Sequence, residues 1–150
     1  MKEKLDFARL PLVLIAIFFI GNLVLGATGA SYDAAKRGFS IVILDMHIAL
    51  LWAAVGRRYR GYNTRGAILA VVLIVFVSQI LIWGATIFSY LTGLQTYFSD
   101  PVAIAGSTEA VSFAQAMLAR AGGLLANCIL AAILGAIGSS MAGLIPKEKT

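Results

Sequence analysis

Four apolar runs, long enough or nearly long enough to cross a lipid bilayer, constrain this chain more than any other feature of its sequence. They cover residues 10–30, 39–55, 67–92 and 122–145. A helix needs about 20 apolar residues to span the roughly 30 Å hydrocarbon core of a bilayer. The runs lack the two-residue alternation that is typical of membrane β-barrels. The sequence therefore predicts an all-α fold, a four-helix transmembrane bundle that forms a single domain over residues 1–150.

The composition agrees with a lipid environment. Apolar residues make up 60% of the chain and charged residues only 13%, against roughly 45–50% and about 25% in soluble domains. A soluble domain of this size could not bury so much apolar surface. The net charge of +5 is concentrated in segments between or beside the apolar runs, which indicates membrane topology rather than a nucleic-acid partner. The predicted surroundings are therefore the lipid bilayer.

Basic residues outside the apolar runs predict the orientation. The loop Gly56–Gly66 carries four arginines and no acidic residue, and basic loops stay in the cytoplasm. With that loop inside, the amino- and carboxyl-terminal segments are cytoplasmic too, and nine of the twelve basic residues lie inside. These nine are Lys2, Lys4, Arg9, Arg57, Arg58, Arg60, Arg65, Lys147 and Lys149. We therefore expect both termini in the cytoplasm.

A short repeat links the first and third runs. The stretches Gly26–Tyr32 and Gly84–Tyr90 are identical at five of seven positions with an offset of 58 residues. Coincidence in a small apolar alphabet is one explanation. The other is a duplicated two-helix hairpin, an arrangement that places binding sites at the interface between the repeats.

The connection between the third and fourth runs, Gly93–Ala121, carries signals for turns and a helix. Asp100-Pro101 predicts a turn. Ser107 is suited to capping a helix, with Glu109 favourable in its first turn. We expect a short outer helix over residues 107–120 that leads into the fourth span, with Gly122-Gly123 as a possible break.

A ridge of small and polar residues recurs every four positions in the fourth run. Such a ridge allows another helix to approach closely, either within this chain or from a second subunit. Its members are Asn127, Ala131, Gly135, Ser139 and Gly143.

Polar residues inside the apolar runs are the candidates for a site. Asp45 and His47 lie near the middle of the second run. An acid at the centre of a membrane helix costs about 2.5–3.5 kcal/mol on insertion scales, so both residues are expected to face partners inside the bundle. Because two residues correspond to about 200° of helix rotation, they cannot address the same partner. Asn22, Ser78, Gln79 and Asn127 offer polar groups on the neighbouring runs. One interpretation is an interhelical hydrogen-bond cluster; the other, strongest for His47, is a ligand-binding or proton-handling role.

Haem is the expected cofactor, because neutral histidine is a common axial ligand of haem and four-helix bundles hold haem between facing helices. The chain has one histidine and one cysteine, which makes a structural zinc site improbable. As the metal ligand, His47 supplies one axial position. The second position would be empty or filled by water, a methionine, the Cys128 thiolate, or the histidine of another subunit.

Three stretches resemble the four-helix unit of haem A synthase and the small four-helix membrane proteins like it. In that family, odd helices carry a polar residue followed by a Gly-Gly/Ala-Thr stretch near the outer end, and even helices carry a haem-ligating His. Here Asn22-Leu-Val-Leu-Gly-Ala-Thr28 and Gln79-Ile-Leu-Ile-Trp-Gly-Ala-Thr86 match the first feature, and Asp45-Met-His47 matches the second.

The chain departs from that family at two places. Its fourth run has Asn127-Cys128 where the family carries a second His, and residues 29–38 lack the cysteine pair found in many members. The resemblance therefore implies the scaffold and one haem ligand, and does not imply haem A synthesis.

These observations favour a cytochrome-like or haem-handling accessory subunit of a respiratory or oxidase assembly, bound to other membrane subunits, over a stand-alone enzyme. His47 would ligate the haem iron. Asp45, Asn22 and Gln79 would orient that ligand or contact a propionate or a quinone. The alternatives are a non-catalytic structural subunit of a membrane complex and a small transporter or proton-conducting subunit with Asp45 titrating at mid-membrane.

Overall fold

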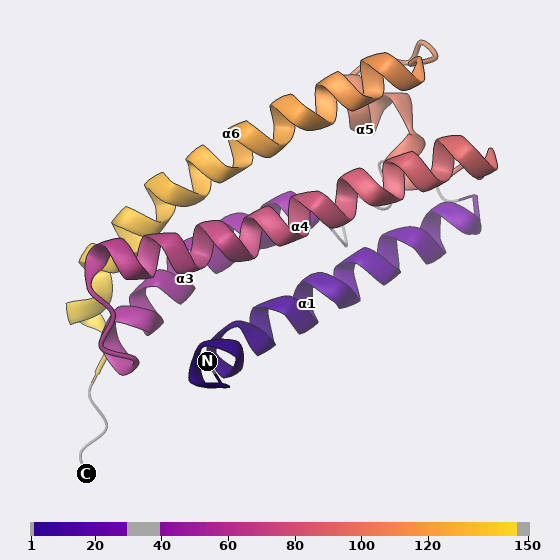
Figure 1. Cartoon of the computed structure of the whole chain (residues 1–150). Helices are drawn as coiled ribbons and strands as arrows, with labels where there is room; N and C mark the ends of the chain where they lie inside the picture. Colours follow the sequence, from indigo (N-terminus) through magenta and orange to yellow (C-terminus); the bar gives the residue numbers. More distant parts are fainter. Residues whose placement is uncertain (1, 30–39, 147–150) are drawn as a thin grey trace.

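Every element in the described part of the chain is helical, as the sequence predicts. The computed structural model describes residues 2–29 and 40–146. Four long helices cross the molecule with alternating direction, and three short elements lie at their ends (Figure 1). In chain order they are α1 (Lys2–Ala27), α3 (Ile41–Tyr59), α4 (Thr64–Thr92), η1 (Tyr97–Ser99), α5 (Pro101–Ala105), α6 (Phe113–Ser140) and η2 (Met141–Leu144).

Helix α4 is the central helix. Figure 1 shows α6 along one side of it and α1 along the other. The most apolar stretch of α4 is 39% buried, whereas those of α1 and α6 are each 17% buried. Helices α3, α4 and α6 share a core of small and β-branched residues, namely Ala49, Ala53, Ala67, Val71, Val75 and Ala131. The α3–α4–α6 unit is thus closely packed, and most of the outer surface of α1 and α6 is apolar and exposed.

In the described part of the chain, three helices are long and apolar enough to cross a membrane, which marks the chain as a membrane protein. They extend over Asp6–Ala27, Thr64–Thr92 and Phe113–Leu144. Helix α3 is not among them, because its 19 residues include three charged ones, Asp45, Arg57 and Arg58. The fourth span therefore stays a prediction.

Helix α1 begins earlier than the apolar run and contains a proline. The apolar run begins at residue 10, whereas the helix begins at Lys2 and Pro11 lies inside it. Proline has no N–H, so the carbonyl four residues earlier, that of Phe7, loses its helical donor. The Trp52 indole N–H of α3 donates to this carbonyl at 2.7 Å. A side chain of a neighbouring helix thus replaces the missing backbone bond and fastens α1 to α3.

The predicted outer helix over residues 107–120 is wrong in its position. Residues 107–112 are not helical, and α6 begins at Phe113, where Ser112 forms a capping box with Gln115. It then continues without a break through Gly122-Gly123. The short helix that precedes it is α5, which is capped by the Asp100 carboxylate. Ser107 instead accepts a hydrogen bond from the Glu109 N–H within a turn.

Both Gly-Ala-Thr stretches lie against η1 at the same end of the bundle. A Cβ added to Gly26 would come within 2.8 Å of Thr96 Cα, and Thr86 Oγ1 donates to the Phe98 carbonyl at 3.1 Å. Their surroundings differ, because Thr86 is buried and Thr28 is exposed. Residues 30–32 of the first copy lie outside the described residues, so the duplicated hairpin stays a prediction.

The ridge of small residues in α6 packs within the chain. A Cβ on Gly135 would approach Val71 Cγ2 of α4 to 2.8 Å. The neighbouring Gly138 lies directly on the Leu50 backbone of α3, where an added Cβ would come within 2.8 Å of the carbonyl carbon. Ala131 and Ser139 are fully buried. The intramolecular interpretation of the ridge is therefore confirmed for residues 131–139, whereas Gly143 is exposed with open space around it.

We predict that Gly138→Ala destabilises the protein, whereas Gly122→Ala in the same helix does not. A methyl group at position 138 would overlap the Leu50 backbone, and overpacking of this kind costs about 1–3 kcal/mol. A Cβ at Gly122 meets nothing within 4 Å, so alanine there is expected to stabilise the helix by about 0.5–1 kcal/mol. Unfolding of both variants in detergent micelles measures the difference; equal stability would contradict the close approach of α3 and α6.

Candidate functional site

Asp45 and Gln79 form a buried polar pair between α3 and α4. Asp45 is fully buried and Gln79 is 6% exposed. The Gln79 side-chain N–H donates to Asp45 Oδ2 at 3.0 Å. The buried Ser78 hydroxyl lies next to the same carboxyl group and interacts with it, but no described residue forms a close hydrogen bond with Ser78 Oγ or Asp45 Oδ1. The pair is thus a single interhelical hydrogen bond sealed inside the bundle.

Apolar layers enclose this pair along α3. Ile41, one turn earlier on the same face, packs with Ile82 and Phe98. Ala49, one turn later, belongs to the α3–α4–α6 core. The buried face of α3 therefore carries no further polar side chain next to Asp45 that could relay a proton along it.

His47 does not face the interior, contrary to the expectation that both polar residues find partners inside the bundle. Its side chain is exposed on the surface of α3. Since Asp45 points into the bundle, the 200° rotation between the two positions turns His47 outward. Among the described residues, His47 forms no hydrogen bond to Asp45, Asn22 or Gln79, and its Nδ1 lies 2.8 Å from the Ile43 carbonyl oxygen of its own helix.

The hydrogen bond to Ile43 determines which imidazole nitrogen of His47 carries the proton and which has a free lone pair. A carbonyl oxygen can only accept, so Nδ1 carries the proton that it donates. In a neutral imidazole, Nε2 is then the nitrogen with the free lone pair. Ile43 and Leu51, one turn before and after on the same face, are 56% and 57% exposed. The outward face of α3 thus presents one lone-pair donor on an apolar surface.

Asn22 is buried in α1 but does not join the other candidates. Its side-chain amide donates to the Phe18 carbonyl of its own helix at 3.0 Å. Of the four predicted site residues, the structure brings Asp45 and Gln79 into direct contact and places His47 on the opposite face of α3. Among the described residues, no three His, Cys, Asp or Glu side chains gather as a metal site.

A second polar cluster, which the sequence-based predictions did not include, lies near the end of the bundle that contains η1. Arg120 of α6 donates from Nε to Thr86 Oγ1 and from Nη2 to the Phe98 carbonyl, both at 3.0 Å. Its guanidinium group thereby joins α6, α4 and η1. The isolated arginine near the start of the fourth helix was the signal for this cluster, since a cation in an apolar helix needs a protein partner.

We predict that Gln79→Leu destabilises the protein by about 1–3 kcal/mol, because it leaves a buried carboxyl group without its donor. Asp45→Asn retains an oxygen acceptor for Gln79 and is expected to fold with at least wild-type stability. The double variant Asp45→Leu/Gln79→Leu removes both polar groups and should recover most of the loss. Unfolding in detergent micelles tests the series; a double variant as unstable as the sum of the single Asp45→Leu and Gln79→Leu changes would show that the pair is not coupled.

Comparison with known protein families, curated proteins and solved structures gives no match. The resemblance to the haem A synthase unit therefore stays a prediction that rests on the residues quoted for it.

Proposed function

We propose that the protein is a haem-binding accessory subunit of a larger membrane assembly, with His47 as an axial ligand at the outward face of α3. The observation that carries the proposal is the Nδ1–H bond from His47 to the Ile43 carbonyl at 2.8 Å. Metal-ligating histidines commonly donate their second ring nitrogen to a carbonyl or carboxylate, which fixes the tautomer and the ring orientation. His47 has this bond, and its Nε2 is available for coordination.

The surroundings of His47 suit a flat apolar cofactor. Haem is largely hydrophobic, and exposed isoleucine and leucine side chains flank the imidazole along α3. A haem iron supplies one-electron redox chemistry when it is coordinated by protein ligands. The contribution of this chain would be to bind one axial position and to hold the imidazole ring in a single orientation.

Asp45 and Gln79 have a positioning role in this proposal and do not act as ligands. Their hydrogen bond fixes the rotation of α3 against α4. Because His47 lies two residues from Asp45, that rotation also fixes the direction in which the imidazole projects.

A non-catalytic structural subunit is the second candidate. An imidazole nitrogen without a donor is unfavourable in lipid, and a hydroxyl or amide on a partner helix could satisfy it as well as iron could. The exposure of His47 favours this candidate too, since both functions place a partner on the same face of α3.

We further propose four spans with both termini in the cytoplasm. Helices α1 and α4 run in the same direction, so the chain between them must return across the bundle, and α3 is the described helix that makes this return. The arginine-rich loop lies beside the carboxyl end of the fourth long helix, because Arg57 donates to the Ser139 carbonyl at 3.2 Å and the Tyr59 hydroxyl donates to the Pro146 carbonyl at 3.0 Å. The positive-inside rule then assigns this end to the cytoplasm.

Absorption spectroscopy tests the haem proposal. Protein purified from haem-replete cells is expected to show a Soret band, and His47→Ala should lose it because the chain has no other histidine. Asp45→Asn keeps an oxygen acceptor for Gln79 and therefore the rotation of α3, so this variant should retain the band. Colourless wild-type protein that copurifies with other membrane proteins would instead support the structural subunit.

Cysteine labelling tests the topology. In a Cys128→Ser background, Thr108→Cys in the outer connection is expected to react with a membrane-impermeant maleimide in intact cells. Thr64→Cys, within the arginine-rich loop, should react only after permeabilisation. Both positions are exposed, so accessibility within the protein does not limit either reaction. The reverse pattern would invert the proposed orientation.

A further inference from the structure

A narrow apolar groove of about 210 Å³ lies between α1 and α4, near the end of the bundle that carries the arginine-rich loop. Helix α1 lines one side with Ala8 and Leu12, and α4 lines the other with Ala70, Leu73 and Val77. The Leu73 and Val77 side chains are 62% and 44% exposed, so the groove is open at the surface. Because both helices are long and apolar enough to cross a membrane, this surface faces lipid.

Aromatic side chains fix the wall of the groove next to the arginine-rich loop. The Phe7 ring, which lines the groove, lies 6.0 Å from the Trp52 ring and 5.3 Å from the Tyr62 ring. The Trp52 indole N–H also donates to the Phe7 carbonyl. A Cβ on Gly56 would approach Phe7 Cζ to 3.0 Å and Tyr62 Cδ2 to 3.1 Å, so glycine allows both rings to lie close to α3. The groove therefore has a defined shape that several elements hold in place.

The size and direction of the groove suit a single hydrocarbon chain. Its volume is smaller than the roughly 300–1,000 Å³ that is usual for small-molecule pockets. From Ala70 to Val77 it follows α4 over about 10 Å, at 1.5 Å of rise per residue. Since α4 is a membrane-capable helix, this direction is close to that of the lipid acyl chains around it. One acyl chain can thus lie along the groove.

Basic residues lie beside the end of the groove that is nearest the arginine-rich loop. Arg9 is exposed and lies three residues before Leu12, a spacing that makes the two side chains neighbours on the surface of α1. Arg60 is exposed and lies two residues before Tyr62. Of the acidic residues whose side chains the structure describes, only Asp6 lies at this end of the bundle. The described side chains therefore give this end a positive charge.

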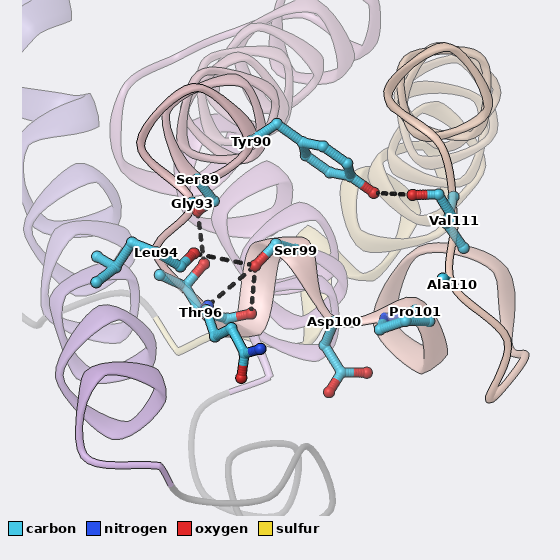
Figure 2. A pocket seen from close by; sticks show the side chains of 11 residues that line it. Ser89, Tyr90, Gly93, Leu94, Thr96, Ser99, Asp100, Pro101, Ala110 and Val111 are labelled. Atoms are coloured by element: carbon cyan, nitrogen blue, oxygen red, sulfur yellow. Dashed lines mark hydrogen bonds between the residues drawn. The ribbon is translucent and has the colours of Figure 1, made fainter.

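The Tyr62 hydroxyl is the one polar side-chain group of the groove lining, and it forms no hydrogen bond with any described residue. A larger cavity of about 400 Å³ beside η1 differs in this respect. There the Tyr90 hydroxyl donates to the Val111 carbonyl at 2.7 Å (Figure 2). The Ser89 and Thr96 hydroxyls of that cavity lie 2.7 Å apart (Figure 2). These hydroxyls hold the cavity walls together, whereas the Tyr62 hydroxyl is available to donate to a ligand.

We propose that the groove binds an anionic phospholipid, with one acyl chain along α4 and the phosphate group beside Arg9, Arg60 and Tyr62. Arginine donates charged hydrogen bonds to phosphate, often in pairs. Basic residues next to a membrane helix also attract anionic headgroups. A zwitterionic lipid fits less well, because its cationic group meets the same arginines. The site is independent of haem binding at His47.

Native mass spectrometry of the full-length protein in detergent tests the lipid class. Phosphatidylglycerol and phosphatidylcholine with identical acyl chains differ only in the headgroup. Retention of phosphatidylglycerol is expected to be at least about tenfold stronger, because two arginines attract its net negative charge. Glycerophosphoglycerol, which is the same headgroup without acyl chains, is expected not to bind at concentrations at which the lipid saturates the protein.

Two pairs of variants test the groove and the charge separately. Ala70→Phe fills the groove and is expected to lower phosphatidylglycerol retention at least about tenfold, because the acyl chain loses its apolar contacts. Ala126→Phe adds the same side chain at an exposed position of α6 outside the groove and should leave retention unchanged. Arg9→Gln/Arg60→Gln should reduce the preference for phosphatidylglycerol at least about tenfold. Asp6→Asn, which removes a negative charge, should not weaken that preference.

Any of four results would overturn the proposal. These are equal retention of the two lipids, binding of glycerophosphoglycerol as strong as that of the lipid, full retention by Ala70→Phe, and an unchanged preference in the double arginine variant. If Ala70→Phe does not fold, the comparison with glycerophosphoglycerol on wild-type protein decides whether the acyl chain is needed.

Discussion

The requirement that polar groups inside an apolar bundle find partners within the protein governs this structure. Lipid offers no hydrogen bonds, so each unsatisfied group costs free energy that water would otherwise recover. The Phe7 carbonyl, freed by Pro11, is bonded by Trp52. Asp45 is bonded by Gln79, and the guanidinium group of Arg120 is bonded by Thr86 and the Phe98 carbonyl. Each of these bonds joins two different helices. The few polar residues of the bundle therefore also determine how its helices are arranged along their lengths.

His47 differs from these residues, because it faces outward and its hydrogen bond lies within its own helix. Its Nδ1–H is satisfied by its own helix, and its second nitrogen faces outward among isoleucine and leucine side chains. The helix satisfies one imidazole nitrogen in this way, and no described residue forms a hydrogen bond with the other. The protein thus has one buried polar position, Asp45, that receives a hydrogen bond from a neighbouring helix, and one exposed position, His47, whose second nitrogen has no donor among the described residues. This difference is the physical basis for the proposal that a partner or cofactor binds on the outside of α3.

The sequence predicts the helical class and the approximate extents of α3 and α4, because apolar runs and their flanking arginines are strong signals. It also predicts Gln79 among the possible partners of Asp45. The predicted start of α6 is wrong, because the prediction places the helix cap at Ser107. The sequence does hold the correct signal, since only Ser112 is followed at the third position by a residue, Gln115, that completes a capping box. The position of His47 was wrong for a different reason. Helical spacing shows that Asp45 and His47 lie on opposite faces, but spacing alone does not show which face packs inward.

Side-chain size resolves that choice of face. The face of α3 that contains Asp45 continues through Ala49, Ala53 and Gly56, all of which are buried, and small residues of this kind allow helices to approach closely. The face that contains His47 carries the larger Ile43 and Leu51. Gly138 of α6 lies on the α3 backbone at Leu50, a separation that leaves no room for large side chains between the two helices. Rotating α3 to bury His47 would force these side chains into that contact and would expose Asp45 to lipid, at about 2.5–3.5 kcal/mol for the acid alone. Packing of the small residues therefore buries Asp45. The hydrogen bond from Gln79 lowers the cost of burying this carboxyl group, and His47 faces outward because it lies on the opposite side of α3.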